Sequence, residues 1–355
     1  MNSKDIVEML YQQGFSPFVG VPCSLLAGII TELETRGNYI SATDEGEAIA
    51  VVAGAALAGK LPVALMQNSG LGNAVNPITS LINVFGFKGL LFIGYRGYPH
   101  GTDEIQHQFM GSITEKLLNL LEIKSFRLSA ENTKDTLGSA IDCVKTENKT
   151  VAILLPEGVI DKDDTVKTTN GNTLNATIVI NEIFRYLTNT DTVISTTGTI
   201  SRMVFDTNHR TKNFYMFGSM GCANAMGLGY SIINNDDSRI VVIDGDGAVL
   251  MKLGSMSTSS KFGKKLIHIV LDNGCYSTTG GQLSNSTFVD FEKVAKGCGY
   301  QNVFTVETVE ELPKLEQAMN RTKTLVAVKI NNDKPKSLPR IKLCDIDLES
   351  FAIES

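Results

Sequence analysis

Residues 239–247 (RIVVIDGDG) and 266–274 (LIHIVLDNG) decide the fold class of this chain. Each begins as a short apolar run rich in β-branched residues, which predicts a buried parallel strand, and each ends in a glycine turn with a polar side chain. The carboxyl ends of parallel strands meet at one edge of a sheet, where open α/β folds bind ligands. The sequence therefore predicts Asp246 and the amide oxygen of Asn273 at one such edge.

Asp246 and Asn273 both offer oxygen atoms, which hard cations prefer. Mg²⁺ takes one or two carboxylate or amide oxygens, keeps some water and completes its octahedron with substrate phosphates. A Gly-Asp-Gly turn also follows many strands simply because glycine tolerates positive backbone angles. The pattern by itself leaves a metal-diphosphate site and a plain turn both open.

Composition indicates an ordinary globular protein. The 355 residues, 43% hydrophobic and 20% charged, suffice for two domains. No apolar run approaches the roughly 18 residues of a membrane helix, and the start MNSKDIVEML lacks the layout of a signal peptide, so we expect a cytoplasmic protein. The net charge of -6 argues against nucleic acid or an anionic membrane as a partner.

The six cysteines are scattered without a CxxC pair, which predicts buried thiols and neither a zinc site nor a disulfide framework.

A polar, charge-rich stretch at 161–174 (DKDDTVKTTNGNTL) is the best domain boundary. It predicts a first domain at 1–162, a linker at 163–174 and a second domain at 175–355. Short apolar runs alternate with helix-length segments in both halves, which predicts βαβ units and parallel sheets.

The two halves share a glycine pattern. Each has a helix of small residues, then a strand, then a Gly-x-Gly turn, which fits two related α/β domains, although glycine-rich strand ends recur in any α/β protein. The glycines stand sixteen and two residues apart in each half, at Gly54, Gly70 and Gly72 and at Gly229, Gly245 and Gly247.

The run GDG-x24-DN resembles the signature of thiamine-diphosphate-dependent enzymes, which is a GDG followed by a pair of asparagines. Asp272 replaces the first asparagine of that pair. The resemblance implies that Mg²⁺ is bound by Asp246, by Asn273 and by the backbone carbonyl of Cys275, and that the departure at Asp272 leaves these ligands intact.

Residues 44–48 (DEGEA) are similar to the run in which this family carries its essential glutamate. The resemblance implies that Glu45 hydrogen-bonds to the aminopyrimidine ring of the cofactor and activates it. From the residues alone, Glu45 is also explained as a carboxylate stabilised at a helix N-terminus.

The segment 218–221 (GSMG) resembles the family's loop beneath the cofactor. This implies that Met220 supports the bent cofactor and that the Gly218 carbonyl accepts from the aminopyrimidine, although a methionine in such a loop can simply be packed in a core. The diphosphate is expected to meet backbone donors in two turns, which contain Thr197, Gly198, Gly247 and Ala248.

The resemblance is strongest to the compact branch of the family, the phosphonopyruvate and sulfopyruvate decarboxylases, and runs almost end to end. It implies an α/β fold of two doubly wound parallel-sheet domains that bind thiamine diphosphate, a pyrimidine-binding domain followed by a diphosphate- and Mg²⁺-binding domain, with no middle domain. The segments that carry it are 20–24 (GVPCS), 67–77 (QNSGLGNAVNP), 94–97 (GYRG), 103–107 (DEIQH), 195–198 (STTG), 271–274 (LDNG) and 279–282 (TGGQ).

A substrate with a phosphonate beside a carboxylate and a ketone needs several converging donors. Arg96 and His107 are the first candidates, with His107 as proton donor or anion binder. Arg96 could instead pair with Asp103, and His107 could be an ordinary surface histidine. The loop 97–111 is predicted to fold over the substrate. Neutral donors are expected from Asn68, Ser69 and Gln282.

The expected reaction is the decarboxylation of 3-phosphonopyruvate to phosphonoacetaldehyde and carbon dioxide in phosphonate biosynthesis, with sulfopyruvate as the alternative substrate. Glu45 and Asp246 lie in different halves, so the resemblance implies a homodimer or higher oligomer with the active site at a subunit interface. A dinucleotide site is disfavoured because no GxGxxG follows a strand. A non-catalytic cofactor-binding subunit is disfavoured because Glu45, Asp246 and Asn273 are all present.

Overall fold

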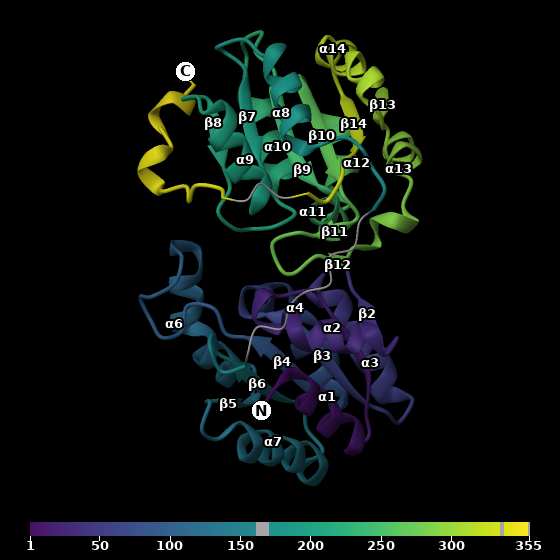
Figure 1. Ribbon diagram of the computed structural model, residues 1–355, viewed down its shortest axis with the longest axis vertical. Helices are drawn as coiled ribbons and strands as arrows, with labels where there is room; N and C mark the ends of the chain where they lie inside the picture. Colours follow the sequence, from purple (N-terminus) through teal and green to yellow (C-terminus); the bar gives the residue numbers. More distant parts are fainter. Residues whose placement is uncertain (161–169, 334–336, 354–355) are drawn as a thin grey trace. The chain divides into compact units, whose positions relative to one another are not determined.

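The computed structural model describes residues 1–160, 170–333 and 337–353 (Figure 1). The chain forms two compact units. Unit 1 is Met1–Lys167 with Thr279–Gln282, and unit 2 is Thr168–Thr278 with Leu283–Ser355. Residues 161–162 of the predicted first domain and 163–169 of the predicted linker lie outside the described residues.

Unit 1 is built on a parallel six-stranded sheet in the order β2-β1-β3-β4-β6-β5. Alternate residues of a strand point to opposite faces, so Val63 and Leu65 of β3 join one hydrophobic core and Ala64 and Met66 the other. Helices α1, α2 and α7 cover the first face, and α3, α4 and α6 cover the second. The strands are β1 Phe15–Gly20, β2 Tyr39–Ser41, β3 Leu61–Gln67, β4 Leu90–Gly94, β5 Lys124–Arg127 and β6 Val151–Leu155; the helices are α1 Ser3–Gln12, α2 Ala27–Thr35, α3 Glu45–Leu57, α4 Leu71–Pro77, α5 Asn83–Phe85, α6 Ile105–Leu120 and α7 Thr133–Glu147.

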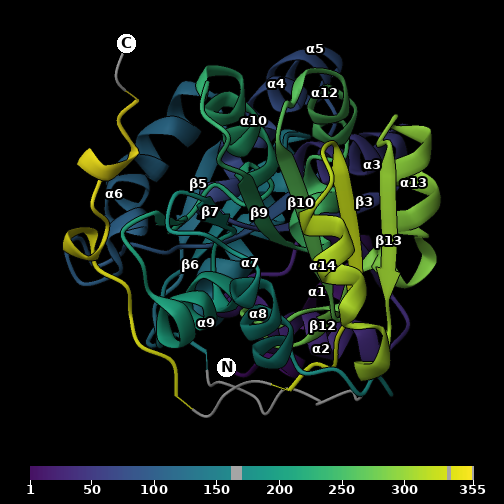
Figure 2. The same cartoon turned by 90° about the horizontal axis from the view of Figure 1, so that it is seen from above.

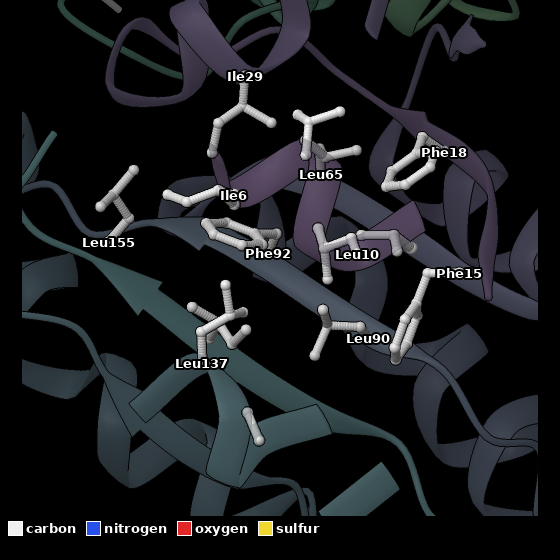
Figure 3. Packing of buried hydrophobic residues seen from close by; sticks show 14 of the residues in the cluster. Ile6, Leu10, Phe15, Phe18, Ile29, Leu65, Leu90, Phe92, Leu137 and Leu155 are labelled. Atoms are coloured by element: carbon white, nitrogen blue, oxygen red, sulfur yellow. The ribbon is translucent and has the colours of Figure 1, made fainter. Parts of the chain in front are cut away.

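The first core of unit 1 is shown in Figure 3. Leu90 and Phe92 of β4 pack there with Ile6 of α1, Ile29 of α2 and Leu137 of α7, and all five side chains are almost fully buried. Strands covered on both faces are mostly apolar, which is why β4 reads as a continuous hydrophobic run in the sequence.

Unit 2 has a second parallel six-stranded sheet, in the order β13-β14-β10-β9-β7-β8 (Figure 2). Helix α8 begins after Asn175, whose side chain accepts from Thr177 N, and buries Val179, Ile180 and Ile183 on one face of the sheet together with α9 and α14. Helices α10, α12 and α13 cover the other face. The strands of this sheet are β7 Thr192–Ser195, β8 Asn213–Tyr215, β9 Ile240–Gly245, β10 Leu266–Asp272, β13 Asn302–Val306 and β14 Thr324–Lys329; the helices are α8 Ala176–Arg185, α9 Thr199–Asn208, α10 Ala223–Ile233, α11 Asp246–Met251, α12 Ser255–Phe262, α13 Phe291–Gly297 and α14 Pro313–Met319. Strands β11 Cys275–Tyr276 and β12 Gln282–Leu283 form a separate two-stranded sheet.

Residues 170–174, at the end of the predicted linker, contact unit 2. Leu174 is fully buried in its core. The side-chain amide of Asn170 donates to Asn273 O at 2.9 Å and to Ile330 O at 2.8 Å.

The two large sheets have the same topology. With the strands of each numbered in chain order, both sheets read 2-1-3-4-6-5. Strand β3 thus corresponds to β9 and β4 to β10. The predicted fold of two doubly wound parallel sheets is confirmed, and so is the repeat that the glycine spacing suggested. In this topology the second strand is added on one side of the first, and the third strand on the other side. The sheet edge between the first and third strands is therefore a topological switch point, where α/β folds bind ligands.

All six cysteines are free, as predicted. Cys23, Cys143 and Cys275 are buried, but the expectation of burial is wrong for Cys344, which is exposed, and for Cys222 and Cys298, which are partly exposed. Burial raises the pKa of the Cys23 thiol to about 11, so this group stays protonated near neutral pH. Within the described ranges, no helix has the length and apolar character needed to span a membrane.

We expect Leu90→Ala to destabilise unit 1 by about 2–5 kcal/mol, because it removes a buried side chain and leaves a cavity. Leu120→Ala is the matched control: Leu120 is 79% exposed on α6, and its removal should change the free energy of unfolding by no more than about 0.5 kcal/mol. Urea unfolding followed by circular dichroism measures both. Equal effects of the two substitutions would contradict the assignment of the core.

Candidate active site

The carboxyl ends of β9 and β10 bring two acidic side chains together in unit 2. The strands pair in parallel with Leu271 opposite Gly245, so Asp272, the last residue of β10, and Asp246, which follows β9, lie at the same edge of the sheet. The sequence predicted Asp246 and Asn273 for this edge and gave Asp272 no role there. Both are almost fully buried. Ser284 Oγ donates to Asp246 Oδ2 and lies 2.9 Å from Ser286 Oγ, which donates to Asp272 Oδ1 at 2.8 Å.

The two carboxylates differ in how their charges are compensated. Lys329 Nζ lies 2.5 Å from Asp272 Oδ2. Burial, and then the charge of Asp272, raise the pKa of Asp246 to about 6, although hydrogen bonds from Ser284, Ser286 and Gly247 oppose the shift. Asp246 is therefore a carboxylate whose ionised form a nearby cation would stabilise.

The other predicted metal ligands follow β10 directly. Asn273 Oδ1 accepts from Cys275 N at 3.1 Å, and its amide nitrogen donates to Ser277 Oγ at 2.7 Å. Cys275 O accepts from Ser277 N at 3.1 Å. A carbonyl-type oxygen has two lone pairs, so Asn273 Oδ1, which accepts the one hydrogen bond from Cys275 N, retains capacity for a cation. Within the described part of the chain, no group of three or more His, Cys, Asp or Glu could hold a metal, so a cation here also needs amide, carbonyl and phosphate oxygens.

The turn after β7 contains the predicted diphosphate ligands Thr197 and Gly198. Thr197 Oγ1 donates to Phe217 O at 2.8 Å. Gly198 has a φ of +86°, and a Cβ there would lie 2.8 Å from Thr278 Cγ2, so both backbone angle and space require glycine. Helix α9 begins next, and its first amides have no acceptor within the helix.

Glycines also bring the loop 218–221 against the start of α11. A Cβ on Gly221 would lie 3.1 Å from Ala248 O, and Met220 in this loop is partly exposed. A Cβ on Gly247 would lie 2.5 Å from Tyr276 Cε1. The predicted loop under the cofactor and the turn of Gly247 and Ala248 are therefore neighbours in unit 2.

Several features of unit 2 fit a bound diphosphate and cation. The hydroxyl of Thr196 is buried at the end of β7 and contacts no hydrogen-bond partner in the described residues. The pKa of Asp246 is raised because the carboxylate is buried and lies near the charge of Asp272. The amides that begin α9 and the backbone around Gly247 are the type of donor that phosphates use.

In unit 1, Glu45 is the first residue of α3 and is 5% exposed. Asp44 caps the helix by accepting from Gly46 N at 2.8 Å, so Glu45 is not needed as the cap. Asn73 donates to Glu45 Oε2 at 2.8 Å, and a Cβ on Gly70 would lie 2.2 Å from Glu45 Oε1. This buried, oriented carboxylate differs from the exposed first-turn glutamate that helix electrostatics alone would explain.

Arg96, just after β4, forms the ion pair that the sequence left open. Its Nε and Nη2 donate to the two carboxylate oxygens of Asp103 at 2.7 and 2.6 Å. His107 lies half-buried in the first turn of α6. Burial, and then the charge of Arg96, lower the pKa of His107, although Asp103 and Glu104 oppose this. Near neutral pH the imidazole is thus neutral, with one donor and one acceptor nitrogen.

The three predicted neutral donors differ in what they offer. Both N–H groups of the Asn68 amide are used, by Arg96 O and Thr114 Oγ1, each at 2.9 Å. Ser69 is exposed and accepts from Gln67 Nε2. The buried Nε2 of Gln282 has no hydrogen-bond partner within the ranges that the structure describes.

Sequence reasoning gave no role to several residues that hold the site together. Asn73 lies in a segment that resembles the family, so this position was visible although its contact with Glu45 was not. Ser284 and Ser286 lie in a loop 38 and 14 residues away from their carboxylate partners, and no motif marks them.

Comparison with known proteins gives a consistent result. The family described as thiamine pyrophosphate enzyme, C-terminal TPP binding domain, matches residues 196–330; thiamine pyrophosphate is another name for thiamine diphosphate. The phosphonopyruvate decarboxylase of Streptomyces viridochromogenes is 35% identical over 336 residues, which cover 88% of this chain and 83% of that protein.

Two further relatives match part of the chain. Sulfopyruvate decarboxylase subunit beta of Methanocaldococcus jannaschii is 36% identical over 42% of this chain and 80% of that subunit. Sulfopyruvate decarboxylase subunit alpha of Methanothermobacter thermautotrophicus is 32% identical over 43% of this chain and 94% of that subunit. With the near full-length match and the matched cofactor-binding domain, these similarities show that the chain belongs to the family of thiamine-diphosphate-dependent decarboxylases, which are carbon–carbon lyases.

Proposed function

We propose that this chain catalyses the non-oxidative decarboxylation of 3-phosphonopyruvate to phosphonoacetaldehyde and carbon dioxide, a step of phosphonate biosynthesis. The bond between the carboxylate and carbonyl carbons breaks, carbon dioxide leaves, and the carbonyl carbon receives a proton in its place. The near full-length match to a phosphonopyruvate decarboxylase carries this proposal, because a match over 88% of the chain includes parts of both units.

Thiamine diphosphate, when bound, supplies the electron sink for the pair of electrons that the departing carbon dioxide leaves behind. We assign unit 2 to hold this cofactor and Mg²⁺. The proposed diphosphate ligands are in the turns with Thr197, Gly198, Gly247 and Ala248; the Gly218 carbonyl and Met220 contact the rings; and Asp246, Asn273 and the Cys275 carbonyl bind Mg²⁺.

Glu45 is the proposed carboxylate that hydrogen-bonds to the aminopyrimidine ring and holds its proton. Its burial strengthens that hydrogen bond, because competing water is excluded. Asn73 fixes one carboxylate oxygen, and the missing side chain of Gly70 leaves room for the other. The contacts of Glu45 thus set the direction of its carboxylate.

Substrate binding is assigned to Arg96, His107, Ser69 and Gln282. Neutral His107 has one donor and one acceptor nitrogen, which suits a hydrogen bond to the anion. To deliver a proton to the product carbon, the ring must first be protonated. Gln282 offers a buried N–H group. Asn68 has both N–H groups engaged, so we assign it to hold Arg96 rather than to touch the substrate.

Sulfopyruvate is the alternative substrate, because sulfonate and phosphonate have the same tetrahedral oxygens and differ mainly in charge. The shorter, partial matches to sulfopyruvate decarboxylase subunits favour it less than the near full-length relative favours phosphonopyruvate. A cytoplasmic location stays a prediction from the sequence.

We further propose a homodimer or higher oligomer, in which Glu45 of one subunit and Asp246 of another serve the same cofactor. Apolar side chains are exposed on helices of both units, which supports burial against another copy: Val51 and Leu57 on α3, Val84 and Phe85 on α5, and Met226, Ile232 and Ile233 on α10.

Release of carbon dioxide and aldehyde from phosphonopyruvate, sulfopyruvate and pyruvate, with and without thiamine diphosphate and Mg²⁺, tests the reaction. We expect cofactor-dependent turnover with the highest kcat/KM for phosphonopyruvate, in line with the near full-length relative. Pyruvate should be the poorest substrate, because it lacks the second anionic group that the site must satisfy. Preference for sulfopyruvate would select the alternative, and no turnover of any substrate would refute the proposal.

Glu45→Gln should lower kcat by at least about 100-fold, since it removes the group that holds the ring proton. The affinity for thiamine diphosphate, measured by calorimetry in the presence of Mg²⁺, should stay nearly unchanged because unit 2 holds the diphosphate. Glu47→Gln, an exposed neighbour on the same helix, is the control and should keep full activity. Undiminished activity of the Glu45 variant would exclude the catalytic assignment.

Asp246→Ala should weaken Mg²⁺-dependent binding of thiamine diphosphate by at least about tenfold, because it removes the proposed carboxylate ligand. Asp206→Ala, at an exposed position on α9, is the control. Retained affinity in the Asp246 variant would contradict the metal site.

Mixing these two inactive variants tests the shared site. A mixed dimer of Glu45→Gln and Asp246→Ala subunits would have one intact site of its two, so exchange between subunits should restore about a quarter of the wild-type activity. No recovery, although subunit exchange is shown by native mass spectrometry, would mean that each site uses one chain alone.

A further inference from the structure

Asp103 holds one edge of the Arg96 guanidinium in a fork of two hydrogen bonds, to Nε and Nη2. The same carboxylate accepts from Gly97 N at 2.8 Å and Glu104 N at 2.7 Å. Burial would raise the pKa of Asp103, but these hydrogen bonds and the charge of Arg96 hold it well below its usual range. The pair is therefore fully ionised and has one fixed geometry.

The backbone of Arg96 is fixed as well. Asn68 Oδ1 accepts from Arg96 N at 3.2 Å, and its amide nitrogen donates to Arg96 O. The next residue, Gly97, approaches α6 so closely that a Cβ there would lie 2.2 Å from His107 O. Three separate elements of unit 1, the ends of β3 and β4 and the start of α6, thus hold this arginine.

The other edge of the guanidinium, formed by Nη1 and Nη2, makes only a long hydrogen bond within the described residues. A guanidinium has five N–H groups. Asp103 takes those of Nε and one of Nη2, and within the described residues the only other acceptor is Ser24 Oγ, at 3.4 Å from Nη1. The Arg96 side chain keeps 20% of its surface exposed. Two parallel N–H groups on one edge match two oxygens of a tetrahedral anion.

The corresponding strand ends of unit 2 carry the proposed cation site. Asn68 follows β3 as Asp246 follows β9, and Arg96 and Asn273 follow the corresponding strands β4 and β10. In unit 1 this edge therefore has the N–H groups of Arg96, held by Asn68, where unit 2 has oxygen atoms, which suits an anion rather than a cation.

We propose that Asp103 is a positioning residue that presents the Nη1–Nη2 edge of Arg96 to the phosphonate group of the substrate. This rests on the proposed function and goes beyond it, because it says which edge binds and what orients that edge. Since Asp103 cancels the charge of Arg96, the edge recognises paired tetrahedral oxygens rather than total charge. It separates phosphonopyruvate and sulfopyruvate from pyruvate, and hardly separates the first two from each other.

Asp103→Asn tests the proposal in the enzyme with thiamine diphosphate and Mg²⁺. The variant loses one arm of the fork, so KM for phosphonopyruvate and for sulfopyruvate should each rise about tenfold, the effect of one charge-assisted hydrogen bond. The kcat should stay within about twofold of wild type, KM for pyruvate should not change, and calorimetry should give an unchanged affinity for thiamine diphosphate.

Glu104→Gln is the matched control. It removes a neighbouring negative charge that also acts on Arg96, but no hydrogen bond to the guanidinium. It should leave KM unchanged. An equal rise of KM in both variants would show that Asp103 acts through charge alone, and would overturn the positioning role.

Arg96→Lys is the second variant, because it keeps the charge and loses the planar edge. A rise of KM at least as large as that of Asp103→Asn supports the proposal. A rise for Arg96→Lys with no change for a folded Asp103→Asn would overturn it. If neither variant changes KM while the wild type turns over phosphonopyruvate, both the edge and the substrate role of Arg96 are wrong. Absence of wild-type turnover would instead refute the proposed function itself.

Discussion

Two buried carboxylates at the ends of adjacent parallel strands, Asp246 and Asp272, impose the constraint on which the rest of the site depends. Charges removed from water must be compensated, and the register of β9 and β10 keeps these two side by side. Lys329 and Ser286 satisfy Asp272. Asp246 has only hydroxyl and backbone partners in the described part of the chain, and its pKa rises accordingly. Keeping this carboxylate ionised and buried costs free energy, and a bound cation would lower that cost.

The shared topology of the two units shows how one scaffold can serve two kinds of ligand. Parallel strands place their carboxyl ends at one edge whatever residues follow them. After the third and fourth strands, unit 2 has Asp246 and Asn273, whereas unit 1 has Asn68 and Arg96. In the proposed assignments, this edge binds a cation in unit 2 and an anion in unit 1, on the same arrangement of strands.

The sequence was sufficient for the most apolar strands, for their parallel arrangement and for the internal repeat, because burial on both faces favours continuous apolar runs. It did not mark a polar strand such as β5. It also located Glu45 and Asp246 on the correct elements. It left the partner of Arg96 undecided, since pairing with Asp103 and exposure to a ligand are compatible with the same residues. The contacts of Ser284 with Asp246 and of Gly70 with Glu45 were not predictable, because hydrophobic periodicity reports which face is buried and not how closely two loops approach.

The separation of the cores has a consequence for the order in which the chain folds. Unit 1 is complete, apart from the short segment Thr279–Gln282, before the strands of unit 2 are synthesised, and domains generally fold as units from the N-terminus during translation. Parallel strands pair residues far apart in sequence, so each unit must wait for its own late strand, β6 in unit 1 and β14 in unit 2. Glu45 can therefore be buried in folded unit 1 before unit 2, which contains Asp246, has folded. Under the proposed assignment of Glu45 and Asp246, cofactor binding follows the synthesis of unit 2.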